Sequence, residues 1–188
     1  MTASNNSWSA DPLVWGQGAN SFEIFLEPTC PFSARAFAKL DGLLELVGPE
    51  QLTIRIWLQS QPWHLFSGII CRAIVAASTG PDGRQAARQV MAAIFEQREA
   101  FEFEEHRTGR NLDVSPNQLI ARIEEVSGVE VAEGFQISGL EKVVKQHTRY
   151  ARQNGIHESP TFVINGLVNP SVSSGDSIEQ WRDKILAT

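Results

Sequence analysis

The chain has 188 residues, of which 42% are hydrophobic and 20% are charged, and its formal net charge is −6. This size and balance are typical of one globular domain, or of one domain that carries a large insertion. The acidic balance argues against binding to nucleic acid or to an anionic membrane, and no apolar stretch approaches the ~18 residues of a membrane span.

The N-terminal end and the cysteine content indicate a compartment. Residues 1–11 are polar and lack the basic start and apolar run of a secretory signal. Two cysteines cannot form a disulfide framework. We therefore expect a reducing, cytoplasmic setting.

The first sixty residues predict a β-α-β unit. After a loop-like start with a short edge strand at 13–15, the apolar run 22–26 predicts a buried strand. Pro31 suits a first helical turn, and apolar residues at helical spacing continue to Gly48-Pro49, where the helix should end. The alternating segment 52–58 predicts a second strand. Such a unit gives a parallel pair joined by a right-handed crossover.

Helical patterns dominate the middle of the chain. Ser115 is a good N-cap and Pro116 suits the turn after it. The predicted helices cover 65–78, 82–105, a segment opened by Ser115-Pro116, 129–135 and 138–154.

Strand patterns return near the C-terminus. Residues 161–164 and 167–168 predict two strands joined by Asn165-Gly166, a strong hairpin turn signal, and 177–186 predicts a last helix. The chain is therefore α/β, with a small mixed sheet interrupted by helices. We divide it into an N-terminal arm with the βαβ part (1–62), a helical insertion (63–154) and a ββα part (155–188).

Cys30 is the main candidate for chemistry because it stands between the first strand and the first helix. Unpaired backbone N–H groups and the helix dipole favour the thiolate there, and the thiolate is the nucleophilic form. Ser33 stands where a dithiol site has its second cysteine, and its hydroxyl could hydrogen-bond to the thiolate. Glu27 lies close upstream, and its negative charge would oppose the thiolate. A buried, inert cysteine is the alternative.

Two motifs resemble the DsbA-like branch of the thioredoxin superfamily. The run Cys30-Pro31-Phe32-Ser33 follows the first core strand, and Ser159-Pro160-Thr161 precedes the hairpin. The resemblance implies a thioredoxin-like mixed sheet with a large helical insertion. It also implies that Pro160 is cis and lies against Cys30, so that the Ser159 backbone meets an extended substrate. The substrate-binding residues implied in this way are Pro31, Phe32, Ser159, Pro160 and Thr161.

The activity implied by the resemblance is that of a thiol–disulfide oxidoreductase or isomerase. Because Ser33 replaces the resolving cysteine of the family, Cys30 would attack a disulfide and form a mixed disulfide. Glutathione, a second protein thiol or Cys71 would then release it. The expected partners are protein or small-molecule thiols and disulfides, with glutathione as a co-substrate and no metal or prosthetic group. A homodimer is one assembly that the sequence allows.

Two other functions stay open. The Cys-Pro-Phe-Ser run is also similar to the Ser-Pro-[Tyr/Phe]-Ser run of kappa-class glutathione transferases and 2-hydroxychromene-2-carboxylate isomerases. In such an enzyme Cys30 or Ser33 would polarise the glutathione sulfur. The chain could instead be a binding module that uses the groove at Pro160 without catalysis.

Secondary candidates surround this site. Cys71 lies among apolar helical residues, so core packing is favoured over a resolving role. His157 could approach Cys30 and, as a cation, favour its thiolate, although an exposed loop histidine is the favoured interpretation. Trp63 could line a groove near the site. His64 would cap the next helix or touch substrate.

Two further histidines carry no functional expectation. We expect His106, at the end of the helix predicted over 82–105, and His147, within 138–154, at surface positions. Most tryptophans are explained by core packing, including Trp57 in the second strand and Trp181 in the last helix.

Overall fold

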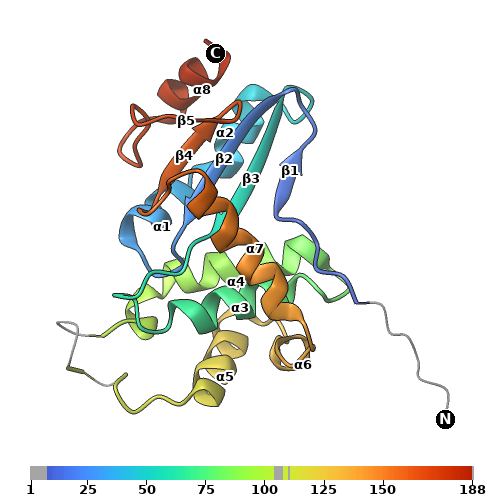
Figure 1. Cartoon of the computed structure of the whole chain (residues 1–188), viewed down its shortest axis with the longest axis vertical. Coiled ribbons are helices and arrows are strands. Elements are labelled where there is room, and N and C mark those ends of the chain that lie inside the picture. Colours follow the sequence, from blue (N-terminus) through green and yellow to red (C-terminus); the bar gives the residue numbers. More distant parts are fainter. Residues whose placement is uncertain (1–7, 104–107, 110, 188) are drawn as a thin grey trace.

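The computed structural model describes residues 8–103, 108–109 and 111–187 (Figure 1). Its strands are β1 (Val14–Gly16), β2 (Asn20–Leu26), β3 (Leu52–Leu58), β4 (Thr161–Ile164) and β5 (Leu167–Val168). Its helices are α1 (Pro31–Phe37), α2 (Leu40–Val47), α3 (Ser67–Ala77), α4 (Gly83–Glu96), the 3₁₀ turn η1 (Arg98–Phe101), α5 (Pro116–Ser127), α6 (Ala132–Phe135), α7 (Leu140–Gln153) and α8 (Ile178–Leu186). None of the described helices is both long and apolar enough to cross a bilayer.

The five strands form one mixed sheet in the order β1-β3-β2-β4-β5. β2 and β3 are parallel, as predicted for the β-α-β unit, and the other pairs are antiparallel. Phe25 on the central strand β2 is paired with Trp57 on β3 and with Thr161 on β4. This register brings the ends of three strands together beside Cys30, which follows β2 by four residues.

Alternation along β2 gives the sheet two different faces. Phe22 packs against Trp181 of α8, with ring centroids 5.4 Å apart, in the main hydrophobic core. Phe25 points to the opposite face and stacks on Tyr150 of α7 at 5.8 Å. Figure 1 shows α7 crossing this second face, with α3 to α6 gathered at the end of the sheet where β2 and β3 finish.

The structure corrects the single helix predicted between Pro31 and Gly48. It breaks at Ala38 and Lys39, where the Lys39 amide bonds to the Ala36 carbonyl, a tighter bond than an α-helical one. The Lys39 ammonium group donates hydrogen bonds to the carbonyls of Ser174 and Asp176 near α8. Helical spacing of the apolar residues does not register such a break, because both halves bury the same face.

The helix predicted over 82–105 is also too long. α4 ends at Glu96, the chain turns at Gln97 with φ −109° and ψ 34°, and the 3₁₀ turn buries Phe101. Residues 104–107 lie outside the described part of the chain. The predicted helix 129–135 shortens to α6, because the Glu124 carboxylate accepts the amide protons of Val131 and Ala132 and so fixes the start of that helix.

Two local predictions are confirmed. Ser115 caps α5 through a capping box with Gln118, and each side chain accepts the other residue's amide proton. Asn165 and Gly166 both have positive φ, of 47° and 81°, as the tight hairpin between β4 and β5 requires.

Candidate functional site

Cys30 lies at the N-cap of α1 and faces the loop that precedes β4. Its thiol is 6% exposed and points at the carbonyl oxygen of Ser159, with Sγ and O 3.7 Å apart. The Ser159–Pro160 peptide bond is cis. Two segments 129 residues apart in sequence therefore meet at the sulfur, as the family resemblance implied.

Ser33 makes a hydrogen bond that the sequence did not predict. Its side chain is fully buried, and its hydroxyl oxygen accepts the amide proton of Glu27 at 3.2 Å. Among the described residues, no hydrogen bond joins Ser33 to the Cys30 sulfur. Ser33 thus holds the β2–α1 connection in place, and a direct effect on the thiolate is a prediction that this geometry leaves untested.

Glu27 is a buried carboxyl group at the base of the site. Its Oε2 accepts protons from the amide of Thr29 at 2.7 Å and from the Thr29 hydroxyl at 2.9 Å. His64 Nδ1 lies 2.8 Å from the same hydroxyl and 3.5 Å from Glu27 Oε2. Burial raises the pKa of Glu27, against the opposing effects of the Ser67 hydroxyl, His64 and Thr29. His64 thus belongs to this network, with 18% of its side chain exposed, while the N-cap of α3 is Phe66. Contact of His64 with substrate stays a prediction.

Two glutamines that the sequence analysis missed hold the loop at Pro160. Gln61 donates to the His157 carbonyl at 3.2 Å and accepts from the Ser159 hydroxyl at 3.0 Å. Gln59 donates to the Ile156 carbonyl at 3.4 Å. Both are buried directly after β3, and polar residues at the carboxyl end of a buried parallel strand were the signal that could have found them.

Cys71 is only 1% exposed, in the interior of α3. Burial raises the pKa of its thiol well above the usual value, and the nearby Glu27 charge adds to this effect. Both cysteines are free thiols. Core packing, favoured from the sequence, is therefore the role that this environment supports, because a buried neutral thiol is a poor nucleophile.

Two exposed aromatic residues lie near Cys30, one in α1 and one in a hollow that Thr29 also lines. Phe32, the second residue of α1, is 54% exposed and lies under the Arg35 guanidinium. Trp63 is 58% exposed and lines a hollow of about 110 Å³ together with Thr29, His64, Phe66 and Phe101. Surface aromatics of this kind suit contact with a protein or peptide.

The remaining predicted site residues take simple positions. Pro31 is the first residue of α1, and Thr161 begins β4, where its hydroxyl donates to the Glu158 carbonyl at 2.7 Å. His157 has an exposed side chain, and its carbonyl is the group that Gln61 holds. Pro160, Thr161 and His157 all line a groove of about 460 Å³ beside β5.

The structure corrects the surface position expected for His147. The ring is buried between α7 and β3, its Nδ1 accepts the amide proton of Leu58 at 2.9 Å, and Trp57 packs edge-on at 5.1 Å. This burial, with the Arg55 charge nearby, lowers the pKa of His147 to about 4. His106 lies outside the described residues.

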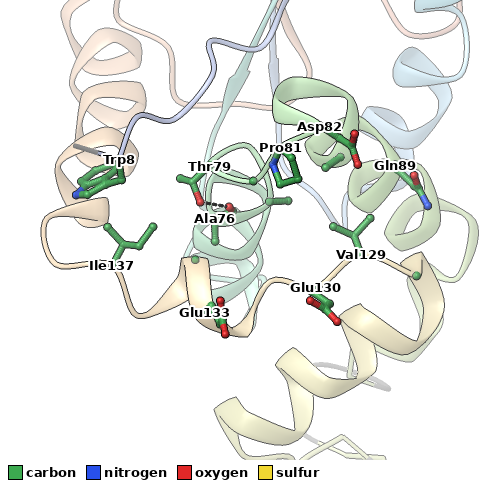
Figure 2. Close-up of a pocket in the computed structure, with 15 residues that line it drawn as sticks. Trp8, Ala76, Thr79, Pro81, Asp82, Gln89, Val129, Glu130, Glu133 and Ile137 are labelled. Atoms are coloured by element: carbon green, nitrogen blue, oxygen red, sulfur yellow. Dashed lines mark hydrogen bonds between the residues drawn. The ribbon is translucent and has the colours of Figure 1, made fainter. Parts of the chain in front are cut away.

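A separate cavity of about 620 Å³ lies in the helical block, between the end of α3, the start of α4 and the segment before α6. Figure 2 shows Trp8 and Ile137 at one side of the cavity and Asp82 and Gln89 at the other. None of the predicted site residues lines it, and it holds no cysteine. It is therefore separate from the site at Cys30.

Comparison with known proteins gives a clear relative. A crystal structure described as a "putative protein-disulfide isomerase" from Pseudomonas syringae is 58% identical to this chain, with a TM-score of 0.91, and the match covers 93% of this chain and 98% of that one. Neither a scan of family models nor a search of curated proteins gave a match.

More distant structures share the fold alone. DsbA2 from Pseudomonas aeruginosa is 15% identical with a TM-score of 0.66, over 96% of each chain. Oxidised BdbD from Bacillus subtilis is 13% identical with a TM-score of 0.67, over 97% of this chain and 98% of that one. These matches extend across the sheet and the helical block together.

Proposed function

Since this chain belongs to the DsbA-like family of thioredoxin-fold disulfide oxidoreductases and isomerases, we propose that it exchanges disulfides through one nucleophilic cysteine, Cys30. The observation that carries this proposal is the thiol of Cys30 facing the Ser159 carbonyl at 3.7 Å, beside the cis Pro160 bond. An extended substrate that pairs with the backbone of this loop would bring its own sulfur to Cys30.

The reaction is a balanced exchange of sulfur bonds. The Cys30 thiolate attacks one sulfur of a substrate disulfide, a mixed disulfide forms, and the other substrate sulfur leaves as a thiolate that takes a proton from water. A second thiolate then attacks the substrate sulfur of the mixed disulfide and restores Cys30. Ser33 cannot supply that thiol, and Cys71 is buried with a raised pKa.

The second thiol would therefore come from outside the site. In isomerisation it is another cysteine of the substrate protein, and no net oxidation occurs. In deglutathionylation it is glutathione, which makes the proposal fit a reducing, cytoplasmic setting. The exposed rings of Phe32 and Trp63 suit a protein substrate whose disulfide is flanked by apolar residues.

The test is covalent trapping with glutathione disulfide. We expect mass spectrometry of the folded protein to find one glutathione on Cys30, both in the natural chain and in Cys71→Ser, and none in Cys30→Ser. Recovery of activity from a scrambled disulfide protein should follow the same pattern. No adduct on the folded chain, together with reversible binding of reduced glutathione, would overturn the proposal in favour of a kappa-like transferase. If neither the adduct nor the binding is found, the result would favour a binding module.

A further inference from the structure

A groove of about 630 Å³ runs between α7 and β3, on the face of the sheet opposite α8. Its volume is within the range of sites for small molecules. Its lining consists of two aromatic residues, three cationic residues and two glutamines: Trp57, Tyr150, Lys142, Lys145, Arg149, Gln146 and Gln153. Neither Cys30 nor any residue of the loop at Pro160 is among them.

The three cations lie on one stripe of α7. Lys142, Lys145 and Arg149 are spaced i, i+3 and i+7, so their side chains project from the same side of the helix. The stripe is ~10 Å long at the usual helical rise. All three are exposed, and within the described part of the chain none of them forms an ion pair. This concentration of positive charge stands out in a chain whose net charge is −6.

Trp57 and Tyr150 form the aromatic wall of the groove, and hydrogen bonds to Glu23 hold both rings in place. Trp57 and Tyr150 lie with ring centroids 4.4 Å apart. The Trp57 indole donates to Glu23 Oε2 at 2.6 Å, and the Tyr150 hydroxyl donates to Glu23 Oε1 at 3.2 Å. Glu23 is 9% exposed, and each of its carboxylate oxygens accepts one of these two protons. Arg55, whose guanidinium lies 5.5 Å from the Trp57 ring centroid, adds a fourth cation beside this carboxylate.

From this arrangement we propose that the groove binds a small polyanion that carries a flat aromatic group, of the nucleoside polyphosphate kind. The aromatic group would rest on the pre-oriented rings of Trp57 and Tyr150, since base–aromatic stacking tolerates any planar ring. The anionic groups would extend along Lys142, Lys145 and Arg149, where the combined positive field is strongest. This site is independent of the chemistry at Cys30.

The probe is ATP, compared with inorganic triphosphate and adenosine, by calorimetry at low salt and by the indole N–H resonance of Trp57, assigned with Trp57→Phe. We expect ATP to bind about tenfold or more tightly than either fragment and to shift this resonance. The variant Lys145→Gln/Arg149→Gln should weaken binding by about tenfold or more. The matched control, Arg152→Gln, removes an exposed cation of α7 that does not line the groove, and should change affinity less than about threefold.

Several results would overturn the proposal. Equal weakening by Arg152→Gln would show attraction to the helix in general. Triphosphate binding as tightly as ATP would remove the role of the aromatic wall. An unshifted Trp57 resonance under saturating ATP, or an acidic peptide that occupies the groove when ATP does not, would assign the surface to a different ligand. Repeating the titration in Cys30→Ser should give the same affinity, because Cys30 does not line the groove.

Discussion

The Cys30 sulfur lies 3.7 Å from the carbonyl oxygen of Ser159. This contact joins the N-cap of α1 to the loop that enters β4, and Gln61 holds the same loop through two further hydrogen bonds. A carbonyl oxygen accepts the thiol proton but offers no stabilisation to a thiolate. Ionisation of Cys30 therefore frees this acceptor for the backbone N–H of an arriving substrate.

The two thiols should differ sharply in reactivity. We expect iodoacetamide to modify Cys30 in the folded protein and to leave Cys71 untouched, because Cys71 is buried and its pKa is raised. Mass spectrometry of peptides after brief labelling measures both sites at once, and labelling in denaturant gives the control in which both react. Modification of Cys71 in the folded state, at a rate near that of Cys30, would contradict this environment and restore Cys71 as a candidate resolving thiol.

The sequence predicted the elements that position the site better than it predicted the site's hydrogen bonds. Strands 22–26 and 52–58, the hairpin at Asn165-Gly166 and the cap at Ser115 all follow from short-range patterns, and the structure confirms them. The prediction that Cys30 lies close to Pro160 depended on a family resemblance, because no local sequence pattern relates residues so far apart in sequence.

Side-chain partners were less accessible from the sequence. From the sequence, Gln61 looks like an ordinary loop residue, but in the fold it bonds to the Ser159 loop. The sequence pattern likewise indicates a surface position for His147, which the packing of α7 on β3 buries. The acceptor role of the Ser33 hydroxyl oxygen towards the Glu27 amide was likewise not visible in the sequence, and donation from Ser33 to the Cys30 thiolate stays a prediction. For Gln61 and His147 the partner lies far away in sequence, and helical or strand periodicity carries no information about such a contact.

Glu27→Gln should make the protein more stable at alkaline pH. Burial raises the pKa of Glu27, so the native state keeps this proton at pH values where the unfolded chain has lost it. The contribution of Glu27 to the free energy of unfolding is therefore largest below the unfolded pKa of about 4.5, and it decreases as pH rises towards the folded pKa. Glutamine keeps an oxygen for the Thr29 donors without the charge, and we expect a gain on the order of 1 kcal/mol at pH 8.

Urea unfolding of both chains at pH 4.5 and pH 8 measures this difference. The gap between Glu27→Gln and the natural chain should widen with rising pH. A gap that narrows, or a variant that is less stable at pH 8, would mean that the ionised carboxylate is stabilised by His64 and Thr29 beyond the cost of its burial.

His147 should give a pH dependence of the opposite sign. Its pKa is about 4 in the native state and ~6.5 in an unfolded chain, so only the unfolded state binds the proton between these values. Titration of His147 leaves the free energy of unfolding unchanged above pH ~6.5. Below that pH the free energy of unfolding decreases, by roughly 3 kcal/mol near pH 4. In His147→Gln, whose amide oxygen can still accept the Leu58 proton, this loss should disappear. Parallel unfolding curves for the two chains from pH 7 to pH 4.5 would refute the buried neutral imidazole.

Tyr150 offers a direct test of the aromatic wall, because it is the only tyrosine in the chain. Burial raises its pKa, Glu23 raises it further by charge and by hydrogen bonding, and Arg55 lowers it. Ultraviolet absorbance of the phenolate against pH reports this one group. Glu23→Gln should lower the pKa yet leave it above the ordinary ~10, since burial persists.

Arg55→Gln is the matched variant for this titration, and it should shift the Tyr150 pKa upwards, because a cation that favours the phenolate is lost. One substitution removes a negative charge and the other removes a positive charge, and the pKa of Tyr150 reports both. A general loosening of the groove would expose the hydroxyl and lower the pKa in both variants. Shifts in opposite directions would therefore show that Glu23 and Arg55 act on Tyr150 electrostatically, within an intact wall.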